Sequence, residues 1–413
     1  MPAAATSLVA RTWAIEDTDA LLTRLPAQGG FAWVHHHSGL VGWGEVARLQ
    51  VSGPDRFVQA QQWWQELTAQ AVVRDEVGVP GSGLLAFGSF AFADSDESVL
   101  VVPEVVLGRR DGTTFVTAIA AGDRVPAQPD LPAVDPPTAP AVTFSDGTLP
   151  GAVWVGIVAD AVARIGRGDV DKVVLAHDVV ATAEEALDWR WPLTRLAERF
   201  PGCWTFAVDG LIGASPEMLV RLERGLVTSR VLAGTIRRTG DDAADAALAG
   251  SLARSSKDLE EHEYAVRSVA EALAPHCSST SLPEAPYVLH LPNVMHLATD
   301  VTGVIADGST SLELAASLHP SAAVCGTPTA AAAALIAEAE TMSRGRYAGP
   351  VGWMNAAGDG EWALALRCGQ VAPDDPARLR LFAGCGIVAG SDPGAELVEA
   401  NAKFLAMREA LGD

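Results

Sequence analysis

The stretch AELVEANAKF, residues 395–404, places two acids and a rare lysine on one predicted helix. Asp392 is suited to cap the start of this helix, and Pro393 is suited to its first turn. At about 100° per residue, Glu396, Glu399 and Lys403 share one face. An apolar stripe about a quarter turn away is formed by Leu397, Ala400, Phe404, Met407 and Leu411. We therefore expect the charged face at the border of the core, beside a cleft; the alternative is ordinary helix electrostatics with a Glu399–Lys403 pair.

A second stretch, SSKDLEEHEYAV, again combines two acids and a lysine, on a helix predicted over residues 256–274. Asp258 and Glu261 are spaced i, i+3, with Lys257 beside them. Two facing helices that each carry a carboxylate pair would form an oxygen-rich site, which suits Mg²⁺ better than zinc. The histidines and cysteines show no spacing typical of a transition-metal site.

Lysine is nearly absent from the chain: 29 basic residues comprise three lysines and 26 arginines. Arginine stays protonated, whereas a lysine with a lowered pKa can act as a general base. Lys172, at the start of the strand-like DKVVLA, is therefore a candidate base, although chance could also leave three lysines anywhere. Glu217, in GASPEMLV, is a candidate proton donor if it is desolvated; the alternative is a solvated glutamate at a strand end.

Composition excludes several partners. The net charge of −22 and the pI of about 4.7 argue against nucleic acid or an anionic membrane surface as the partner. The start of the chain lacks the pattern of a signal peptide, and no apolar run is long enough to span a membrane. The five cysteines form no CxxC pair and are expected to be free thiols. We expect a cytoplasmic protein.

The order of predicted elements is that of an α+β fold. Residues 1–124 read as short strands with a helix over 55–73, residues 125–150 as a proline-rich connecting loop, and residues 151–413 as longer helices and strands. In this last part LIGASPEMLVRLE, residues 211–223, is predicted as one strand.

Nine motifs between residues 170 and 405 resemble, in order and spacing, those of the chorismate-utilising enzymes, most closely the isochorismate synthases of menaquinone and siderophore pathways. They are DKVVLA, GASPEMLV, VLAGTIRR, SKDLEEHEYAV, MHLAT, RGRYAGPVGW, ALALRC, FAGCGIV and ELVEANAKF. The stretches GLVGWGEVARL and FGSFAF resemble the first half of the same family. The resemblance implies a single α+β domain over residues 1–413, with two large, mostly antiparallel sheet layers and helices packed outside.

The resemblance also implies a substrate, chorismate, a cofactor, Mg²⁺, and roles for particular residues. Lys172 would activate the water that attacks C2 of the ring, and Glu217 would protonate the departing C4 hydroxyl. Mg²⁺ would be held by Glu261 and Glu399, with Asp258 and Glu396 helping directly or through water. Substrate contacts are implied for Gly234, Thr235, His296, Tyr347, Arg367, Gly384, Gly386 and Lys403. Lys257 has no implied role beyond supporting the acids of its own helix.

Within this family, Lys172 favours water over ammonia as the nucleophile. Ammonia-using relatives should lack that lysine, and aminodeoxychorismate synthases tend to carry a lysine where this chain has Ala233, so no glutaminase subunit is expected. The chain is thus expected to be an isochorismate synthase, an isomerase, acting as a monomer. A salicylate synthase, which goes on to eliminate pyruvate, is the alternative. A catalytically silent relative should have lost Lys172 or one of the acids, and this chain retains them all.

Overall fold

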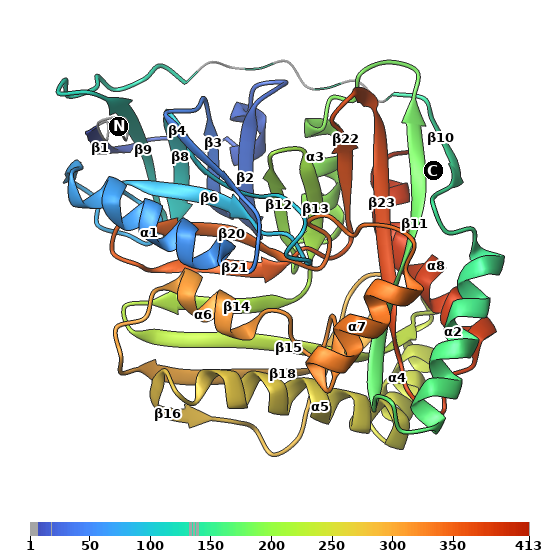
Figure 1. The fold of residues 1–413 in the computed structure, drawn as a ribbon. Helices are drawn as coiled ribbons and strands as arrows, with labels where there is room; N and C mark the ends of the chain where they lie inside the picture. The colour runs from blue at the N-terminus through green and yellow to red at the C-terminus, as the bar shows by residue number, and fades with distance from the viewer. Residues whose placement is uncertain (1–6, 18, 132–133, 135–136, 138–139, 413) are drawn as a thin grey trace.

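The computed structural model describes residues 7–17, 19–131, 134, 137 and 140–412. Two large sheets make up most of it, and both contain strands from the N-terminal and C-terminal halves of the chain (Figure 1). The thirteen-stranded sheet consists of β1 (Leu8–Ile15), β2 (Gly30–His35), β3 (Ser38–Trp43), β5 (Val72–Asp75), β8 (Val105–Arg110), β9 (Thr113–Ala121), β10 (Val142–Asp146), β11 (Lys172–Ala183), β12 (Trp204–Val208), β13 (Leu211–Ser215), β19 (Gly326–Thr327), β22 (Cys368–Ala372) and β23 (Asp375–Ile387).

The ten-stranded sheet consists of β4 (Ala47–Val51), β6 (Leu85–Ser89), β7 (Ser98–Val102), β14 (Met218–Glu223), β15 (Leu226–Arg237), β16 (Cys277–Ser281), β17 (Tyr287–His290), β18 (Val294–Ile305), β20 (Pro350–Asn355) and β21 (Gly360–Leu364). In the described residues only β1 and β5 pair in parallel. The long central pairs join distant segments, since β11 pairs with β23 and β15 with β18. The predicted α+β fold with two mostly antiparallel sheets is confirmed.

The main core lies between the two sheets. Phe31 of β2 stacks on Phe87 of β6 with ring centroids 5.4 Å apart. Trp33, also on β2, donates its indole N–H to Glu361 of β21 at 2.7 Å. Both contacts cross from one sheet to the other, so burial of aromatic side chains fixes how the sheets face each other.

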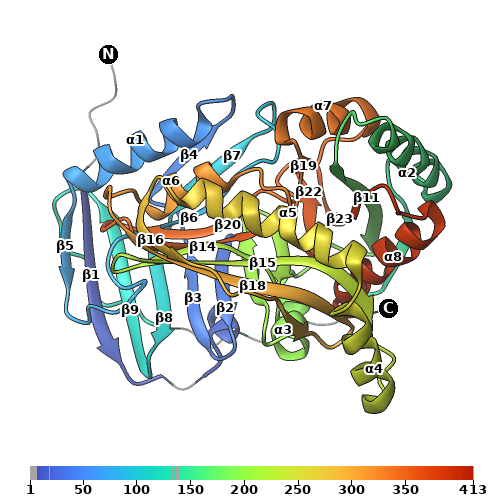
Figure 2. The same cartoon turned by 90° about the horizontal axis from the view of Figure 1, so that it is seen from below.

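Helices cover the outer faces. They are α1 (Arg56–Ala69), α2 (Gly151–Gly166), α3 (Arg190–Arg199), α4 (Asp242–Leu252), α5 (Ser256–Leu273), α6 (Ser311–Leu318), α7 (Thr329–Ala339) and α8 (Pro393–Ala410), with a 3-10 turn, η1 (Leu21–Arg24). Viewed from below, α5 lies across β15 and β18, while α8 packs near β23 and α2 (Figure 2).

Local capping starts the two acidic helices where the sequence predicts. The Asp392 side chain accepts a hydrogen bond from Ala395 N at 2.8 Å at the start of α8, and Pro393 lies in the first turn. Ser255 caps α5 in the same way by accepting from Asp258 N. Because the caps fix where each helix begins, they also fix which residues share a face.

Three expectations differ from the structure. The strand predicted over residues 211–223 is split at Pro216 into β13 and β14, which belong to different sheets. Proline cannot donate a ladder hydrogen bond, so the chain crosses between sheets there. The predicted connecting loop 125–150 contains an edge strand, β10, and helices α4 and α6 were not predicted. None of the helices in the described ranges is both long and apolar enough to cross a bilayer.

Candidate active site

One pocket gathers most of the residues singled out in the sequence. Eleven of the fourteen line it: Glu217, Gly234, Thr235, Glu261, His296, Tyr347, Arg367, Gly384, Gly386, Glu399 and Lys403. These residues come from both sheets and from helices α5 and α8. The other three, Lys172, Asp258 and Glu396, lie outside the lining, and each contacts or neighbours a residue that belongs to it.

Lys172 is the first residue of β11 and lies next to the pocket without lining it. Its side chain is fully buried, and its Nζ is 3.2 Å from Glu261 Oε1 of α5. A Cβ placed on Gly386 would approach Lys172 Cε to 2.9 Å and Glu261 Oε1 to 2.2 Å. The lack of a side chain at Gly386 therefore leaves the lysine and the glutamate room to meet at the pocket.

Glu217 occupies the crossing between the two sheets, directly after Pro216. It is 5% exposed, and its backbone carbonyl accepts from Leu364 N at 3.1 Å. Burial raises the pKa of its carboxyl to about 8, against the smaller opposing effects of a hydrogen bond from Leu232 N and the charge of Lys172. Glu217 is therefore protonated at neutral pH and can donate a proton into the pocket.

His296 is held in one tautomer by its two neighbours. Arg367 Nη2 donates to His296 Nε2 at 3.2 Å, so the other ring nitrogen carries the hydrogen. His296 Nδ1, 3.1 Å from Thr235 Oγ1, then donates to that hydroxyl. Burial and the nearby Arg367 keep the pKa of His296 well below its usual value. His296 is therefore a neutral residue of the pocket lining.

Two arginines anchor the loop that carries Tyr347, whose ring stacks on Phe382 with centroids 5.1 Å apart. On one side, buried Arg344 pairs with Glu340 and donates to Val174 O of β11 at 2.7 Å. On the other, Arg346 Nη2 donates to Asp209 O at 2.6 Å and to Gln370 Oε1 at 3.0 Å.

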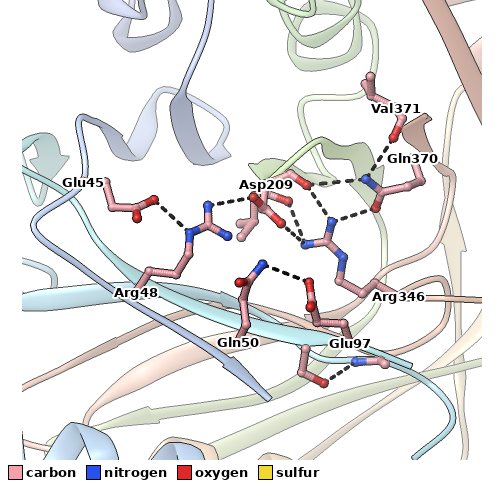
Figure 3. Close-up of polar contacts among 11 residues, drawn as sticks. Glu45, Arg48, Gln50, Glu97, Asp209, Arg346, Gln370 and Val371 are labelled. Carbon is pink, nitrogen blue, oxygen red and sulfur yellow. Dashed lines mark hydrogen bonds and ion pairs between the residues drawn. The ribbon is translucent and has the colours of Figure 1, made fainter. Parts of the chain in front are cut away.

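The Arg346 contacts belong to a wider polar network on the strand ends (Figure 3). Arg48 joins it through Asp209 Oδ1 at 2.8 Å, and Arg346 Nη1 lies 3.2 Å from Asp209 Oδ2. Since Asp209 sits in the tight turn between β12 and β13, the network ties that turn to the Tyr347 loop. The position of Tyr347 is thus set by groups on three separate segments.

The acidic faces of α5 and α8 meet beside the pocket, and lysines lie among them. Lys403 Nζ lies 2.7 Å from Glu399 Oε1 and donates to Gly384 O at 2.8 Å. Although burial disfavours its ammonium, the neighbouring Glu399 carboxylate raises the pKa of Lys403. Lys257 Nζ lies 3.0 Å from Glu396 Oε1. The suggestion that Lys257 supports the acids of its own helix is therefore incomplete, because its ion pair crosses to the other helix.

The acids suit a hard divalent cation. Carboxylate oxygens of Glu396 and Glu399 lie within 4.8 Å of each other and of Cys385 Sγ. Burial raises the pKa of the Cys385 thiol well above its usual value, so it stays protonated and is a poor metal ligand. The carboxylates of Glu396 and Glu399, both on α8, then remain as oxygen donors of this group, the donor type that Mg²⁺ prefers. Asp258 lies against Gly234, where a Cβ would approach Asp258 Cβ to 3.0 Å.

Comparison with known proteins identifies the family. The profile of the family described as chorismate binding enzyme matches residues 6–412, nearly the whole chain. The chain belongs to this family.

The relatives of this chorismate-binding enzyme include the isochorismate synthase DhbC of Bacillus subtilis, 40% identical over 267 residues, which are 62% of this chain and 66% of that protein. The salicylate biosynthesis isochorismate synthase of Pseudomonas aeruginosa is 33% identical over 404 residues, covering 92% of this chain and 84% of that one. Among solved structures, DhbC from Bacillus anthracis superposes with a TM-score of 0.78 at 32% identity, covering 95% of this chain and 98% of its own. The resemblance expected from the motifs is confirmed.

Sequence reasoning missed several residues that build the pocket of this chorismate-binding enzyme. Arg344 and Phe382 both line it, as do Leu232 and Val324. Arg344 stands in the motif RGRYAGPVGW, so a signal was present, but only its burial beside Glu340 shows that it is an anchor. Phe382 carries no signal of its own, because an aromatic residue in a buried strand reads as core.

Proposed function

We propose that this protein is an isochorismate synthase, an isomerase that converts chorismate to isochorismate and depends on Mg²⁺. The family match and the isochorismate synthases among its relatives support the reaction class. The observation that carries the mechanism is a protonated, buried Glu217 lining the same pocket as Glu261, the contact of Lys172. A proton donor therefore lines the cavity, and the candidate base lies one contact away from it, against Glu261.

In the proposed reaction, Lys172 takes a proton from the water that attacks C2 of the ring. Glu217 gives its proton to the C4 hydroxyl, which leaves as water while the ring double bonds shift. One water is added and one is lost, so the product is an isomer of the substrate. Lys172 must be unprotonated when the water attacks, and Glu217 must be protonated when the hydroxyl leaves.

Chorismate is a dianion, and the pocket offers cations and donors for both carboxylates. Arg367 and Tyr347 would clasp the enolpyruvyl carboxylate, with Lys403 and the backbone at Gly384 and Gly386 nearby. Glu261 and Glu399 would hold Mg²⁺, with Asp258 and Glu396 directly or through water. When bound, the ion supplies positive charge for the ring carboxylate in a protein of strongly negative net charge. Gly234, Thr235 and neutral His296 would line the ring.

The proposal also covers the location and the oligomeric state of the enzyme. We place it in the cytoplasm as a monomer without a glutaminase subunit; free thiols at all five cysteines suit a reducing compartment. Mass measurement of the purified protein in solution tests the monomer.

The deciding experiment incubates purified protein with chorismate and Mg²⁺, with and without EDTA, and separates the products by chromatography. Isochorismate in equilibrium with chorismate, formed only with Mg²⁺, is the expected result. Salicylate together with pyruvate would instead identify a salicylate synthase. No conversion in any condition would contradict the proposal.

A further inference from the structure

Each of the three lysines of this chain lies against a different carboxylate of helices α5 and α8. The Nζ–Oε1 distances are 3.2 Å for Lys172 and Glu261, 3.0 Å for Lys257 and Glu396, and 2.7 Å for Lys403 and Glu399. Arginines outnumber lysines 26 to 3 in this chain, yet all three of these contacts use lysine. The choice of an ammonium over a guanidinium therefore coincides with the acidic site.

Lys257 differs from the other two lysines in its exposure. Its side chain is 40% exposed, compared with 0% for Lys172 and 14% for Lys403, while its partner Glu396 is 4% exposed. The Lys257–Glu396 pair also joins residues 139 positions apart in the chain, from the first turn of α5 to the first turn of α8. It thus bridges the two helices, with the ammonium partly exposed and the carboxylate buried.

The charges explain why such a pair is needed. Asp258, Glu261, Glu396 and Glu399 bring four carboxylates onto two adjoining helix faces, and like charges at short range repel. Glu396 is 4% exposed, and the Lys257 ammonium at 3.0 Å is the cation that contacts its carboxylate among the described residues. Without a cation, buried Glu396 would face the other acids with no compensating charge.

We propose that Lys257 is a displaceable counter-ion: it holds Glu396 and joins α5 to α8 in the metal-free protein, and it yields the carboxylate when a divalent cation binds. This inference rests on the proposed function, because it takes the four carboxylates as the metal site. Lys257 is then a positioning residue that sets the affinity of the site for the metal, outside the chemistry assigned to Lys172 and Glu217.

The side-chain chemistry of lysine suits a contact that must be released. An ammonium on a flexible four-carbon stem binds a carboxylate through a single point charge, and an exposed side chain can swing into water. Arginine would offer a planar fork and two parallel hydrogen bonds to Glu396, a stronger contact. Removing the charge and replacing it by arginine should therefore change metal affinity in opposite directions.

A simpler role, a permanent tie between two helices, makes different predictions. A tie stabilises the protein equally with and without metal, and its loss gives no gain in metal affinity. A displaceable counter-ion stabilises mainly the metal-free protein and competes with the metal. Measurements in both states separate the two roles.

The test compares the metal-stripped wild-type chain with Lys257→Met, Lys257→Arg and Arg267→Met. Mn²⁺ is titrated while the electron paramagnetic resonance signal of free Mn²⁺ is followed, and Mg²⁺ is then added as a competitor. Arg267→Met is the matched control. It removes one positive charge from an exposed position of the same helix, where the Arg267 guanidinium stacks on Tyr264. Lys257→Met should bind Mn²⁺ roughly two- to fivefold more tightly, the size expected from losing one partly exposed ion pair. Lys257→Arg should bind more weakly than wild type, and Arg267→Met within about twofold of it.

Thermal unfolding supplies the second readout. Lys257→Met should melt about 1 °C below wild type in EDTA, and this deficit should shrink in saturating Mg²⁺. Equal deficits in both conditions, or unchanged or weaker Mn²⁺ binding by Lys257→Met, would overturn the counter-ion role while leaving the metal site standing. Absence of Mn²⁺ binding by the wild-type chain would overturn the metal site itself, and the inference with it.

Discussion

Two buried glutamates, one just before β14 and one on the neighbouring strand β21, have opposite protonation states. Glu217, just before β14, and Glu361, in β21, are 5% and 3% exposed. Burial raises the pKa of Glu217 to about 8. Burial acts on Glu361 in the same direction, but Arg110, Arg221 and the hydrogen bond from Trp33 outweigh it, so the pKa of Glu361 is lowered.

The difference lies in the partners that each carboxyl meets. Glu361 accepts from Trp33 at 2.7 Å and from Arg110 at 2.7 Å, so its charge is compensated between the sheets. Glu217 accepts only a long hydrogen bond from Leu232 N at 3.4 Å among the described contacts of its carboxylate. Equal burial therefore produces a structural anion in one place and a proton donor in the other, because fixed positive charge is in contact with one and more distant from the other.

Replacing each glutamate by glutamine should separate catalysis from stability. Glu217→Gln should lower kcat for chorismate by about 10²–10⁴-fold, since an amide cannot donate the proton that the leaving hydroxyl needs. The circular dichroism spectrum should stay close to wild type, and so should the melting temperature at low pH, where the carboxyl is largely protonated in both the folded and the unfolded state. Full activity in this variant would remove Glu217 from the mechanism.

Glu361→Gln should give the opposite pattern. The free energy of unfolding should fall by about 2 kcal/mol, because charge-assisted hydrogen bonds from Arg110 and Trp33 are replaced by weaker ones. Denaturant titration measures this loss, and kcat of the folded fraction should change by less than about twofold. A large fall in kcat with unchanged stability would mean that Glu361 acts in the active site.

The raised pKa of Glu217 also predicts a pH dependence. The pKa of Glu217 is about 8 in the folded protein and near 4.5 as an unperturbed carboxyl. Between these values the folded state holds more protons than the unfolded state, so this group's contribution to stability is full at low pH and is lost as pH rises toward about 8. The stability of Glu217→Gln relative to wild type should therefore increase from pH 5 to pH 8, and wild-type kcat should decline above about pH 8. A relative stability independent of pH would place the folded pKa near its ordinary value.

The smallest change expected is at the outer partner of Glu361. Arg221 Nε lies 3.6 Å from Glu361 Oε1, and its side chain is 42% exposed. Arg221→Met should lower the free energy of unfolding by only about 0.5 kcal/mol, and less at high salt, because solvent screens this pair. A loss as large as that of Glu361→Gln would show that Arg221, rather than Arg110, keeps Glu361 ionised.

The sequence predicted the local parts of the fold well. The Asp392 cap placed the start of α8, and the spacing of charged and apolar residues placed α8 and α5, because these signals act within one or two turns of a helix. The sheet crossing at Pro216 was not predicted. Proline disfavours a continuous strand, but the apolar residues on both sides of it led us to predict a single strand. Helix α6 was also missed despite its Thr310–Glu313 capping box.

The candidate site was predicted as residues but not as an arrangement. Spacing put Glu396, Glu399 and Lys403 on one face, and the pocket contains two of them. No local pattern could show that Lys257 meets Glu396 or that Lys172 meets Glu261, since these partners are separated by long stretches of chain. The anchoring of Tyr347 by Arg344 and Arg346 likewise depends on segments that only folding brings together.

The sequence alone determined the α+β class, the two acidic helices, the rarity of lysine and the motifs of the chorismate-binding family. These depend on residue type and short-range spacing, which the chain carries before it folds. Only the tertiary structure decided which lysine meets which acid, that Glu217 is desolvated while Glu361 is compensated, and how one pocket forms from two sheets and two helices. Proton affinity and ion pairing depend on burial and on charges a few ångströms away in space, and those neighbours are set by the packing of distant segments.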